Sequence, residues 1–172
     1  INKKFNSQSK IIAPVYFLNS FDLEFFKQSL VYHKKETKGI ILFTSGTTGI
    51  PKAVHLSEYN LIQSAKLWNE NLKFNQEDIY LSCMPIYHIG GVSIFFRSII
   101  FGFKSIQLNK FDVNLILSFF QNQKITFLSL VPTMLNRISV LFDKKKFKYL
   151  RGFIVSGGSS SEKLIKYCLE ND

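Results

Sequence analysis

One segment of the chain combines small polar residues with a lysine at a spacing suited to binding phosphate. Residues 43–54 read Phe-Thr-Ser-Gly-Thr-Thr-Gly-Ile-Pro-Lys-Ala-Val. Within them lie three hydroxyl side chains, two glycines and one lysine: Ser45, Thr47, Thr48, Gly46, Gly49 and Lys52. Glycines let backbone N–H groups converge on an anion, hydroxyls add hydrogen-bond donors, and lysine supplies a mobile positive charge. This segment, the phosphate loop, is therefore predicted to bind phosphate.

The residues around the phosphate loop predict a strand before it and a helix after it. The apolar run at 40–43 is long enough for a buried strand, and from Ser57 onward apolar residues recur at helical spacing. The loop is not a Walker A motif, in which lysine directly follows the second glycine. Here Lys52 comes three residues after Gly49 and is followed by Ala53. The alternative interpretation is a polar surface turn that happens to be rich in small residues.

Two further segments carry residues suited to a binding site. The first reads Met-Pro-Ile-Tyr-His-Ile-Gly-Gly at 84–91, and the second reads Val-Ser-Gly-Gly-Ser at 155–159. Each follows an apolar run that predicts a strand. Ligands bind beyond the carboxyl ends of strands in open α/β sheets, so all three segments are predicted to lie at such ends.

Together, the three segments resemble the adenylate-forming (AMP-binding) superfamily, which includes acyl-CoA synthetases, peptide-synthetase adenylation domains and firefly luciferases. The phosphate loop resembles its phosphate-binding signature, with Ala53 where the usual version has glycine. Residues 84–91 resemble its Pro-x-x-His acyl-pocket motif, and residues 155–159 its Gly-Gly loop beside the adenine and the acyl group. The motifs also follow one another in the family's order.

The resemblance implies an acid–CoA ligase that joins a carboxylic acid to ATP as an acyl-adenylate and then to coenzyme A. A Mg²⁺ ion bridging the ATP phosphates is expected, and no metal ligand is assigned in this chain. Lys52 is expected to offset charge on the leaving pyrophosphate. The nucleotide-binding residues expected from the resemblance are Thr44, Ser45, Gly46, Thr47, Thr48, Gly49, Lys52, Gly157, Gly158 and Ser159.

His88 and Arg97 are the candidates for contact with the acid. The resemblance places His88 by the acyl pocket, in the catalytic site, although not as a base, because a carboxylate is already ionised near pH 7. The alternative for His88 is a satisfied, partly buried side chain. Arg97 interrupts an apolar helix and could hold a second carboxylate of the substrate through two hydrogen bonds. The alternative for Arg97 is a snorkelling side chain at a helix boundary.

Within the superfamily, the runs 88–97 and 128–137 resemble the o-succinylbenzoate–CoA ligases of menaquinone and phylloquinone synthesis. The substrate of these enzymes carries two carboxylates, of which one is activated and the other needs a cation. A medium- or long-chain acyl-CoA synthetase is the second interpretation, and its pocket would be uniformly apolar. A non-catalytic basic module derived from the enzyme domain, binding nucleic acid or a partner, is the third.

The composition argues against the basic-module interpretation. The net charge is +10, but only three of the 22 basic residues are arginines and the lysines are mostly dispersed. Nucleic-acid grooves typically combine clustered arginines with exposed aromatics. The abundance of Phe, Ile, Asn and Lys is typical of an AT-rich genome, so a lysine-rich solvated surface accounts for the charge. We expect small-molecule partners (a carboxylic acid, ATP and coenzyme A) and no nucleic acid.

The predicted fold class is α/β, with a mainly parallel sheet covered by helices on both faces. Strands are expected at 40–44, 79–83, 105–108, 125–130 and 153–156, and helices at 57–73, 92–101, 112–123, 133–141 and 161–170, with a further helix at 21–32. Asp112 is expected to cap its helix, and Pro132 suits a first helical turn.

The expected organisation is an unassigned segment at 1–39 followed by a partial AMP-binding domain at 40–172. The chain is much shorter than enzymes of this family, so we expect a fragment without the small C-terminal domain and inactive by itself. No apolar run reaches the roughly 18 residues of a membrane helix. The two cysteines have no metal-binding spacing and are expected to be reduced thiols. Export is not expected, which leaves a plastid stroma or a bacterial cytoplasm.

Overall fold

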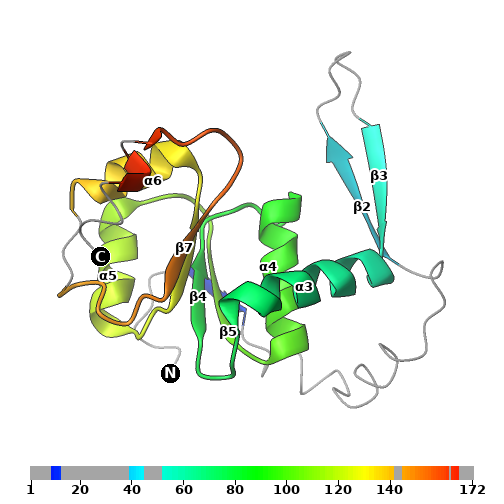
Figure 1. Ribbon diagram of the computed structural model, residues 1–172, viewed down its shortest axis with the longest axis horizontal. Coiled ribbons are helices and arrows are strands. Elements are labelled where there is room, and N and C mark those ends of the chain that lie inside the picture. The colour runs from blue at the N-terminus through cyan, green and yellow to red at the C-terminus, as the bar shows by residue number, and fades with distance from the viewer. Residues whose placement is uncertain (1–8, 13–38, 45–51, 142–144, 163, 167–172) are drawn as a thin grey trace. The chain divides into compact units, whose positions relative to one another are not determined.

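The computed structural model describes residues 9–12, 39–44, 52–141, 145–162 and 164–166 of the 172. The chain divides into two compact units. The sheet unit comprises the described residues within Ile1–Ile11, Glu77–Met84 and Lys104–Asp172. The hairpin unit comprises those within Ile12–Gln76 and Pro85–Phe103. Figure 1 shows the elements of both units.

The sheet unit is built on a five-stranded sheet of order β1-β5-β4-β6-β7. Its strands are β1 (Ser9–Ile12), β4 (Ile79–Ser82), β5 (Lys104–Leu108), β6 (Phe127–Leu130) and β7 (Gly152–Val155). β4 pairs in parallel with both β5 and β6, and β6 pairs in parallel with β7. Two helices belong to this unit, α5 (Val113–Asn122) and α6 (Pro132–Ser139). The predicted α/β class with a parallel sheet is confirmed.

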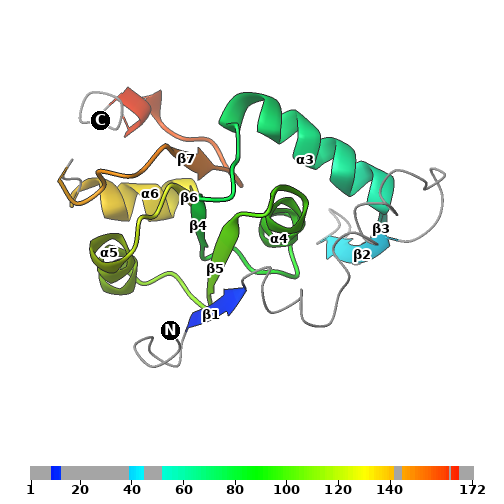
Figure 2. The ribbon, with the colours of Figure 1, turned by 90° about the horizontal axis from the view of Figure 1, so that it is seen from below.

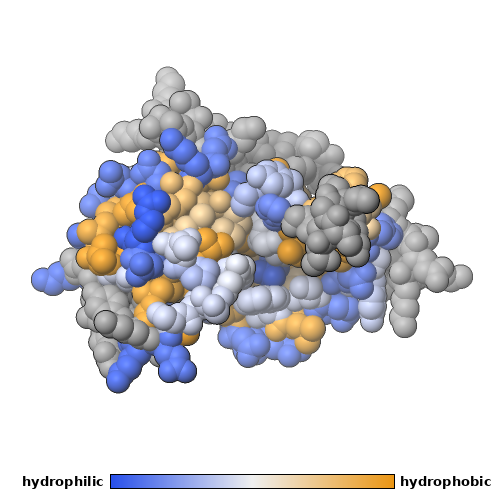
Figure 3. Space-filling model, turned by 90° about the horizontal axis from the view of Figure 1, so that it is seen from above, coloured by the Kyte–Doolittle hydropathy of each residue, from blue (hydrophilic) through white to orange (hydrophobic). Residues whose placement is uncertain are grey.

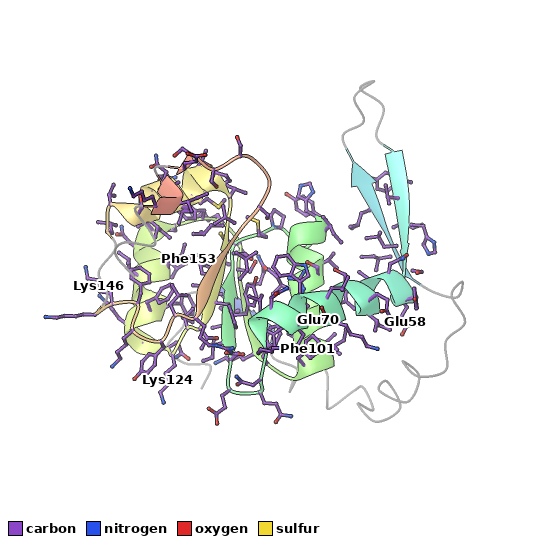
Figure 4. The ribbon with its side chains drawn as sticks, in the orientation of Figure 1. Glu58, Glu70, Phe101, Lys124, Lys146 and Phe153 are labelled. Atoms are coloured by element: carbon purple, nitrogen blue, oxygen red, sulfur yellow. The ribbon has the colours of Figure 1, made fainter. Side chains whose placement is uncertain are left out.

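Two strands of the sheet unit, β4 and β6, are short, mainly apolar runs that are buried on both faces. Every residue of β6 is buried, as are the last three of β4. α5 and α6 lie on one side of the sheet (Figure 2), and their apolar faces pack on alternate strand residues. Phe153, labelled in Figure 4, packs from β7 against the same core. On the other face, the Tyr80 hydroxyl lies 2.8 Å from Ser129 Oγ in a buried hydrogen bond.

The helices of the sheet unit begin where the sequence predicts. Asp112 Oδ1 accepts a hydrogen bond from the backbone N–H of Leu115 at 3.1 Å, which caps α5. Pro132 occupies the first turn of α6, where its missing N–H costs nothing. Part of the last predicted helix is described, with Glu162 and residues 164–166 helical. The prediction of a helix at 21–32 lies outside the described residues.

The hairpin unit contains β2 (Gly39–Thr44), β3 (Lys52–Ser57), α3 (Glu58–Leu72) and α4 (Ile89–Phe101). The two strands form a separate two-stranded sheet, visible as a hairpin in Figure 1. α3 follows β3 and packs beside α4. Phe101, labelled in Figure 4, stacks on Phe74 with 5.8 Å between ring centroids. None of the described helices is long and apolar enough to cross a membrane.

An ion pair joins the amino-terminal ends of β4 and β7. Asp78, directly before β4, is 1% exposed, and Nη1 of Arg151, directly before β7, donates to its two carboxylate oxygens at 2.8 and 2.7 Å. The Arg151 guanidinium also lies over the Phe127 ring of β6, 5.0 Å from its centroid. These contacts tie three parallel strands together at the edge opposite to their carboxyl ends.

Replacing Arg151 with leucine is expected to lower the free energy of unfolding by about 2–3 kcal/mol, because the buried Asp78 carboxylate loses its cation. Arg151→Lys keeps the charge and should lose less. Urea unfolding followed by circular dichroism measures both changes. An unchanged unfolding midpoint in Arg151→Leu would contradict the assigned role.

Candidate functional site

The phosphate loop connects two antiparallel strands. β2 and β3 pair in register from Gly39 opposite Ser57 to Thr44 opposite Lys52. The predicted site residues Thr44 and Lys52 are therefore direct cross-strand partners, with Cα atoms about 5 Å apart. Residues 45–51, which include the predicted site residues Ser45, Gly46, Thr47, Thr48 and Gly49, lie outside the described residues.

Two expectations about this segment were wrong. A second strand, β3, stands between the loop and the helix, so the layout is strand, loop, strand and helix. β2 also belongs to a separate hairpin instead of the parallel sheet, and Ile41 and Phe43 are 61% and 65% exposed, not buried. β3 was missed because its own residues are weak strand signals. It forms because its backbone groups pair with those of β2 across six residue pairs.

The start of α3 is fixed immediately after β3. Ser57 Oγ accepts a hydrogen bond from the backbone N–H of Asn60 at 3.2 Å, and Asn60 Oδ1 accepts one from the backbone N–H of Ser57 at 3.0 Å. This reciprocal capping box satisfies two backbone donors at the helix start. Glu58, labelled in Figure 4, adds a favourable negative charge in the first turn. The strand that begins with Lys52 thus leads directly into a firmly initiated helix.

His88 caps the amino end of α4 through its backbone. A turn in which the His88 N–H donates to the Pro85 carbonyl at 3.0 Å precedes the helix, and the His88 carbonyl then accepts from Gly91 and Val92. The imidazole makes no capping hydrogen bond. It is exposed and lies against the Tyr87 ring, with 4.8 Å between the two ring centroids. The alternative of a partly buried histidine therefore does not describe it. An exposed imidazole at a helix amino end is accessible to an anionic ligand.

Arg97 lies farther along α4, away from His88. Nine residues of helix separate their Cα atoms by about 13 Å along the axis and turn them to opposite sides. The Arg97 side chain is 5% exposed, and its guanidinium lies over the Trp68 ring of α3 at 4.5 Å from the centroid. Arg97 is thus buried within the hairpin unit and packed on an aromatic partner, which the sequence did not indicate. Its contact with a second carboxylate stays a prediction.

The Gly-Gly loop follows β7 at the carboxyl edge of the sheet unit. Ser156 N–H donates to the Leu130 carbonyl at 3.1 Å, and Gly157 adopts a φ of +83°. A Cβ atom on Gly157 would lie 3.3 Å from Val131 Cγ1, and one on Gly158 would lie 3.7 Å from the Pro132 ring. Glycine is favoured here by both the left-handed backbone and the close approach to the start of α6. Ser159, beyond them, is exposed.

Cys83 lies at the same edge, directly after β4, but is unsuited to nucleophilic chemistry. Its Sγ is 3.7 Å from both the Ser129 carbonyl oxygen and Met134 Sδ. Burial raises the pKa of the Cys83 thiol to about 11. The thiol is therefore protonated at neutral pH and acts as a small apolar side chain.

Gln107 is a further polar residue at this edge that sequence reasoning missed. It lies in β5 between Ile106 and Leu108, both of which are buried. Its Nε2 donates to the Met84 carbonyl at 2.8 Å and to the Leu108 carbonyl at 2.9 Å. The signal that could have found it is the carboxamide itself, since an amide between two buried apolar residues needs partners.

Comparison with known proteins places these observations in a family. The sequence profile described as "AMP-binding enzyme" matches residues 16–170. The chain is 34% identical over 131 residues to the 2-succinylbenzoate–CoA ligase of Bacillus mycoides (strain KBAB4), covering 76% of this chain and 27% of that protein. It is 31% identical over 148 residues to the ligase of the same name from Bacillus cytotoxicus, covering 31% of that protein.

Solved structures agree with the sequence comparison. The o-succinylbenzoate coenzyme A synthetase of Bacillus subtilis in complex with AMP matches with a TM-score of 0.70 at 30% identity, covering 76% of this chain and 27% of the solved chain. The same enzyme in complex with ATP and a magnesium ion matches equally well. The chain thus spans about a quarter of the length of these relatives. It belongs to the AMP-binding enzyme family.

Proposed function

We propose that the protein is an ATP-dependent acid–CoA ligase whose acid is 2-succinylbenzoate. The observation that carries the proposal is the hairpin that holds Thr44 opposite Lys52, with the Gly/Ser/Thr loop between them. The similarity to 2-succinylbenzoate–CoA ligases, at 34% identity over three quarters of the chain, supports the choice of acid. Formation of the CoA thioester of this acid would place the protein in menaquinone or phylloquinone synthesis.

The reaction has two steps, each with a defined leaving group. A carboxylate oxygen of the acid attacks the α-phosphorus of ATP, and the bond to pyrophosphate breaks. The sulfur of coenzyme A then attacks the acyl carbon of the adenylate, AMP leaves, and the thiol proton passes to solvent. The first step brings two anions together, so the site needs cations and hydrogen-bond donors around the phosphates.

In this proposal the hairpin unit supplies the phosphate contacts of the first step. The ends of the loop are held in a fixed register by β2 and β3, which lowers the entropy lost when the loop closes on an anion. Lys52 would stabilise charge on the leaving pyrophosphate. Ser45, Thr47 and Thr48 would donate from their hydroxyls, and the N–H groups of Gly46 and Gly49 from the backbone.

The acid would lie by His88, and the adenine by the Gly-Gly loop. The exposed imidazole and the amino end of α4 favour a carboxylate at that position. Gly157 and Gly158 leave no side chain between the loop and a flat ring, and Ser159 adds a hydroxyl. The second carboxylate is assigned to Arg97 from the sequence alone, whereas Arg97 lies about 13 Å farther along α4 than His88, on the opposite side, with its guanidinium over Trp68. Arg97→Leu therefore tests this contact separately.

Magnesium, when bound with ATP, would neutralise phosphate charge. The described residues contain no group of three or more His, Cys, Asp or Glu side chains placed to hold a metal ion.

The arginines give little support to the alternative of a nucleic-acid-binding module. Arg97 lies over Trp68, Arg137 over Phe111 and Arg151 over Phe127, at 4.5–5.0 Å from the ring centroids. Each is thus engaged within the molecule and not arranged along an open groove. Hydrophilic and hydrophobic residues are interspersed over the face seen in Figure 3. This pattern is typical of a solvated surface.

A panel of acids tests the proposal. With ATP and coenzyme A, the full-length protein is expected to release pyrophosphate and form a thioester from 2-succinylbenzoate. For octanoate, kcat/KM should be lower by a factor on the order of a hundred or more. The reason is that a site built to hold a second carboxylate rejects acids that lack it. Equal rates with octanoate would indicate a medium-chain acyl-CoA synthetase. If no acid leads to release of pyrophosphate, the remaining interpretation is the non-catalytic binding module.

A further inference from the structure

The positive charge of the chain is concentrated in one stretch of the sheet unit. Residues 113–161 contain seven basic residues and a single acidic residue, Asp143, so this stretch contributes +6 to the net charge of +10. Asp143 lies outside the described residues. Five of the seven basic residues are lysines, and four of these lie within 144–148. The proposed reaction assigns no role to this group of lysines.

The loop that leads into β7 is anchored by Phe147. This side chain is 5% exposed, and its ring packs edge-on against Phe120 of α5 with 4.4 Å between the ring centroids. The Leu150 N–H donates to the Phe147 carbonyl at 2.8 Å, which closes a turn. The neighbours of Phe147 on either side, Lys146 and Lys148, are both exposed. The loop therefore presents lysines to solvent from a backbone that the core holds in place.

Tyr149 brings together ammonium groups from two parts of the sheet unit. Lys148 Nζ lies over its ring at 4.7 Å from the centroid, and Nζ of Lys124, which follows α5, lies over it at 5.6 Å. The tyrosine is 41% exposed. Lys124 and Lys146, both labelled in Figure 4, project away from the core. Like charges gathered around one exposed ring create a positive potential that an anionic partner would neutralise.

Two exposed apolar side chains lie next to these lysines in the chain. Val140 and Leu141, which follow α6, are 76% and 39% exposed. Four residues separate Leu141 from Lys146, so their Cα atoms are at most about 18 Å apart. The surface thus combines lysines with an aromatic ring and branched apolar side chains. We name it the basic–apolar surface, and its members are Lys124, Val140, Leu141, Lys146, Lys148 and Tyr149.

We propose that the basic–apolar surface binds the anionic face of a lipid bilayer. Lysines near such a bilayer are attracted by its acidic headgroups, and exposed apolar side chains can enter the boundary between headgroups and acyl chains. A nucleic acid fits less well, because it offers no apolar layer to Val140 and Leu141 and is typically bound by arginines. This binding would be peripheral, and it goes beyond the proposed reaction.

Vesicle co-sedimentation of the full-length protein tests the proposal. At about 0.15 M salt, we expect binding to phosphatidylcholine vesicles that contain about 30% phosphatidylserine, and none to phosphatidylcholine alone. Binding should be lost at about 1 M salt, where charges are screened within about 3 Å. The measurement needs neither ATP nor an acid, so its outcome is independent of the proposed reaction.

Charge-matched variants separate this surface from the net charge of the chain. The double change Lys146→Glu and Lys148→Glu is expected to weaken vesicle binding about thirtyfold, which corresponds to about 2 kcal/mol for the two lysines. Val140→Asn should weaken it roughly fivefold, because an apolar contact with the bilayer is lost. The control is Lys66→Glu with Lys110→Glu, at two exposed lysines outside the surface, and it should bind within about twofold of wild type.

Three results would overturn the inference. The first is that the wild-type protein does not bind the phosphatidylserine vesicles. The second is that the control variant loses as much binding as the Lys146 and Lys148 variant at an equal Tm, since net charge alone would then account for the attraction. The third is tighter binding of a single-stranded RNA oligonucleotide than of the vesicles, which would assign the surface to nucleic acid.

Discussion

Lys52→Ala in the full-length protein is expected to lower ATP-dependent pyrophosphate release roughly a hundredfold, and Thr48→Ala roughly tenfold. Lys52 would provide a charge that acts mainly as pyrophosphate leaves, and removing one such transition-state contact typically costs a factor on the order of 10²–10³. Thr48 would provide one of several hydroxyl donors. Its loss should therefore cost less, because the other hydroxyls can still donate hydrogen bonds to the phosphates. Release of pyrophosphate measured at saturating acid gives both values.

The control for this prediction is a lysine of the same unit outside the loop. Lys66 is exposed on α3, and Lys66→Ala should leave pyrophosphate release unchanged. The Tm of all three variants is expected to stay within a few degrees of wild type, because none of the three residues belongs to the described hydrophobic core. Undiminished release in both Lys52→Ala and Thr48→Ala would remove the phosphate-loop assignment and with it the proposed reaction.

Arg97→Leu is expected to raise KM for 2-succinylbenzoate by roughly thirty- to a hundredfold, the cost of losing a charge-assisted contact of about 2–3 kcal/mol. KM for ATP should change far less. An analogue of the acid that lacks the second carboxylate should show no such penalty, because it never used the guanidinium. Steady-state kinetics with the two acids measures the difference.

Trp68→Leu provides the comparison that separates two roles of Arg97. This variant removes the ring under the guanidinium and keeps the charge. If Arg97 serves the substrate, Trp68→Leu should raise KM for the acid less than Arg97→Leu does. If Arg97 only packs α4 against α3, both variants should lower Tm alike, and both acids should suffer equally. That second pattern would favour a general acyl-CoA ligase over one that is specific for 2-succinylbenzoate.

Local signals in the sequence located most helices and strands. Asp112 and Ser57 predict helix starts because a side-chain oxygen there satisfies free backbone N–H groups, and both caps are present. The apolar runs of β4 and β6 predict strands buried on both faces, as the structure has them. These signals act over a few residues, and for this reason they can be read without knowing the fold.

The family, too, was indicated by the sequence alone. A loop that holds phosphate needs particular residue types in a particular order, and such a string is specific whatever surrounds it. The family comparison confirms it over residues 16–170. The individual roles of the loop residues, His88, Gly157, Gly158 and Ser159 remain predictions.

The tertiary structure decided what depends on residues distant in the sequence. β3 exists because β2 pairs with it, and its own Lys and Ala residues are weak strand formers. The strand order β5-β4-β6-β7 depends on crossovers that no local pattern encodes. Trp68 meets Arg97 across 29 positions, and Gln107 meets Met84 across 23. A composition or a spacing cannot reveal such contacts, because a side chain's partner is chosen by how whole elements pack.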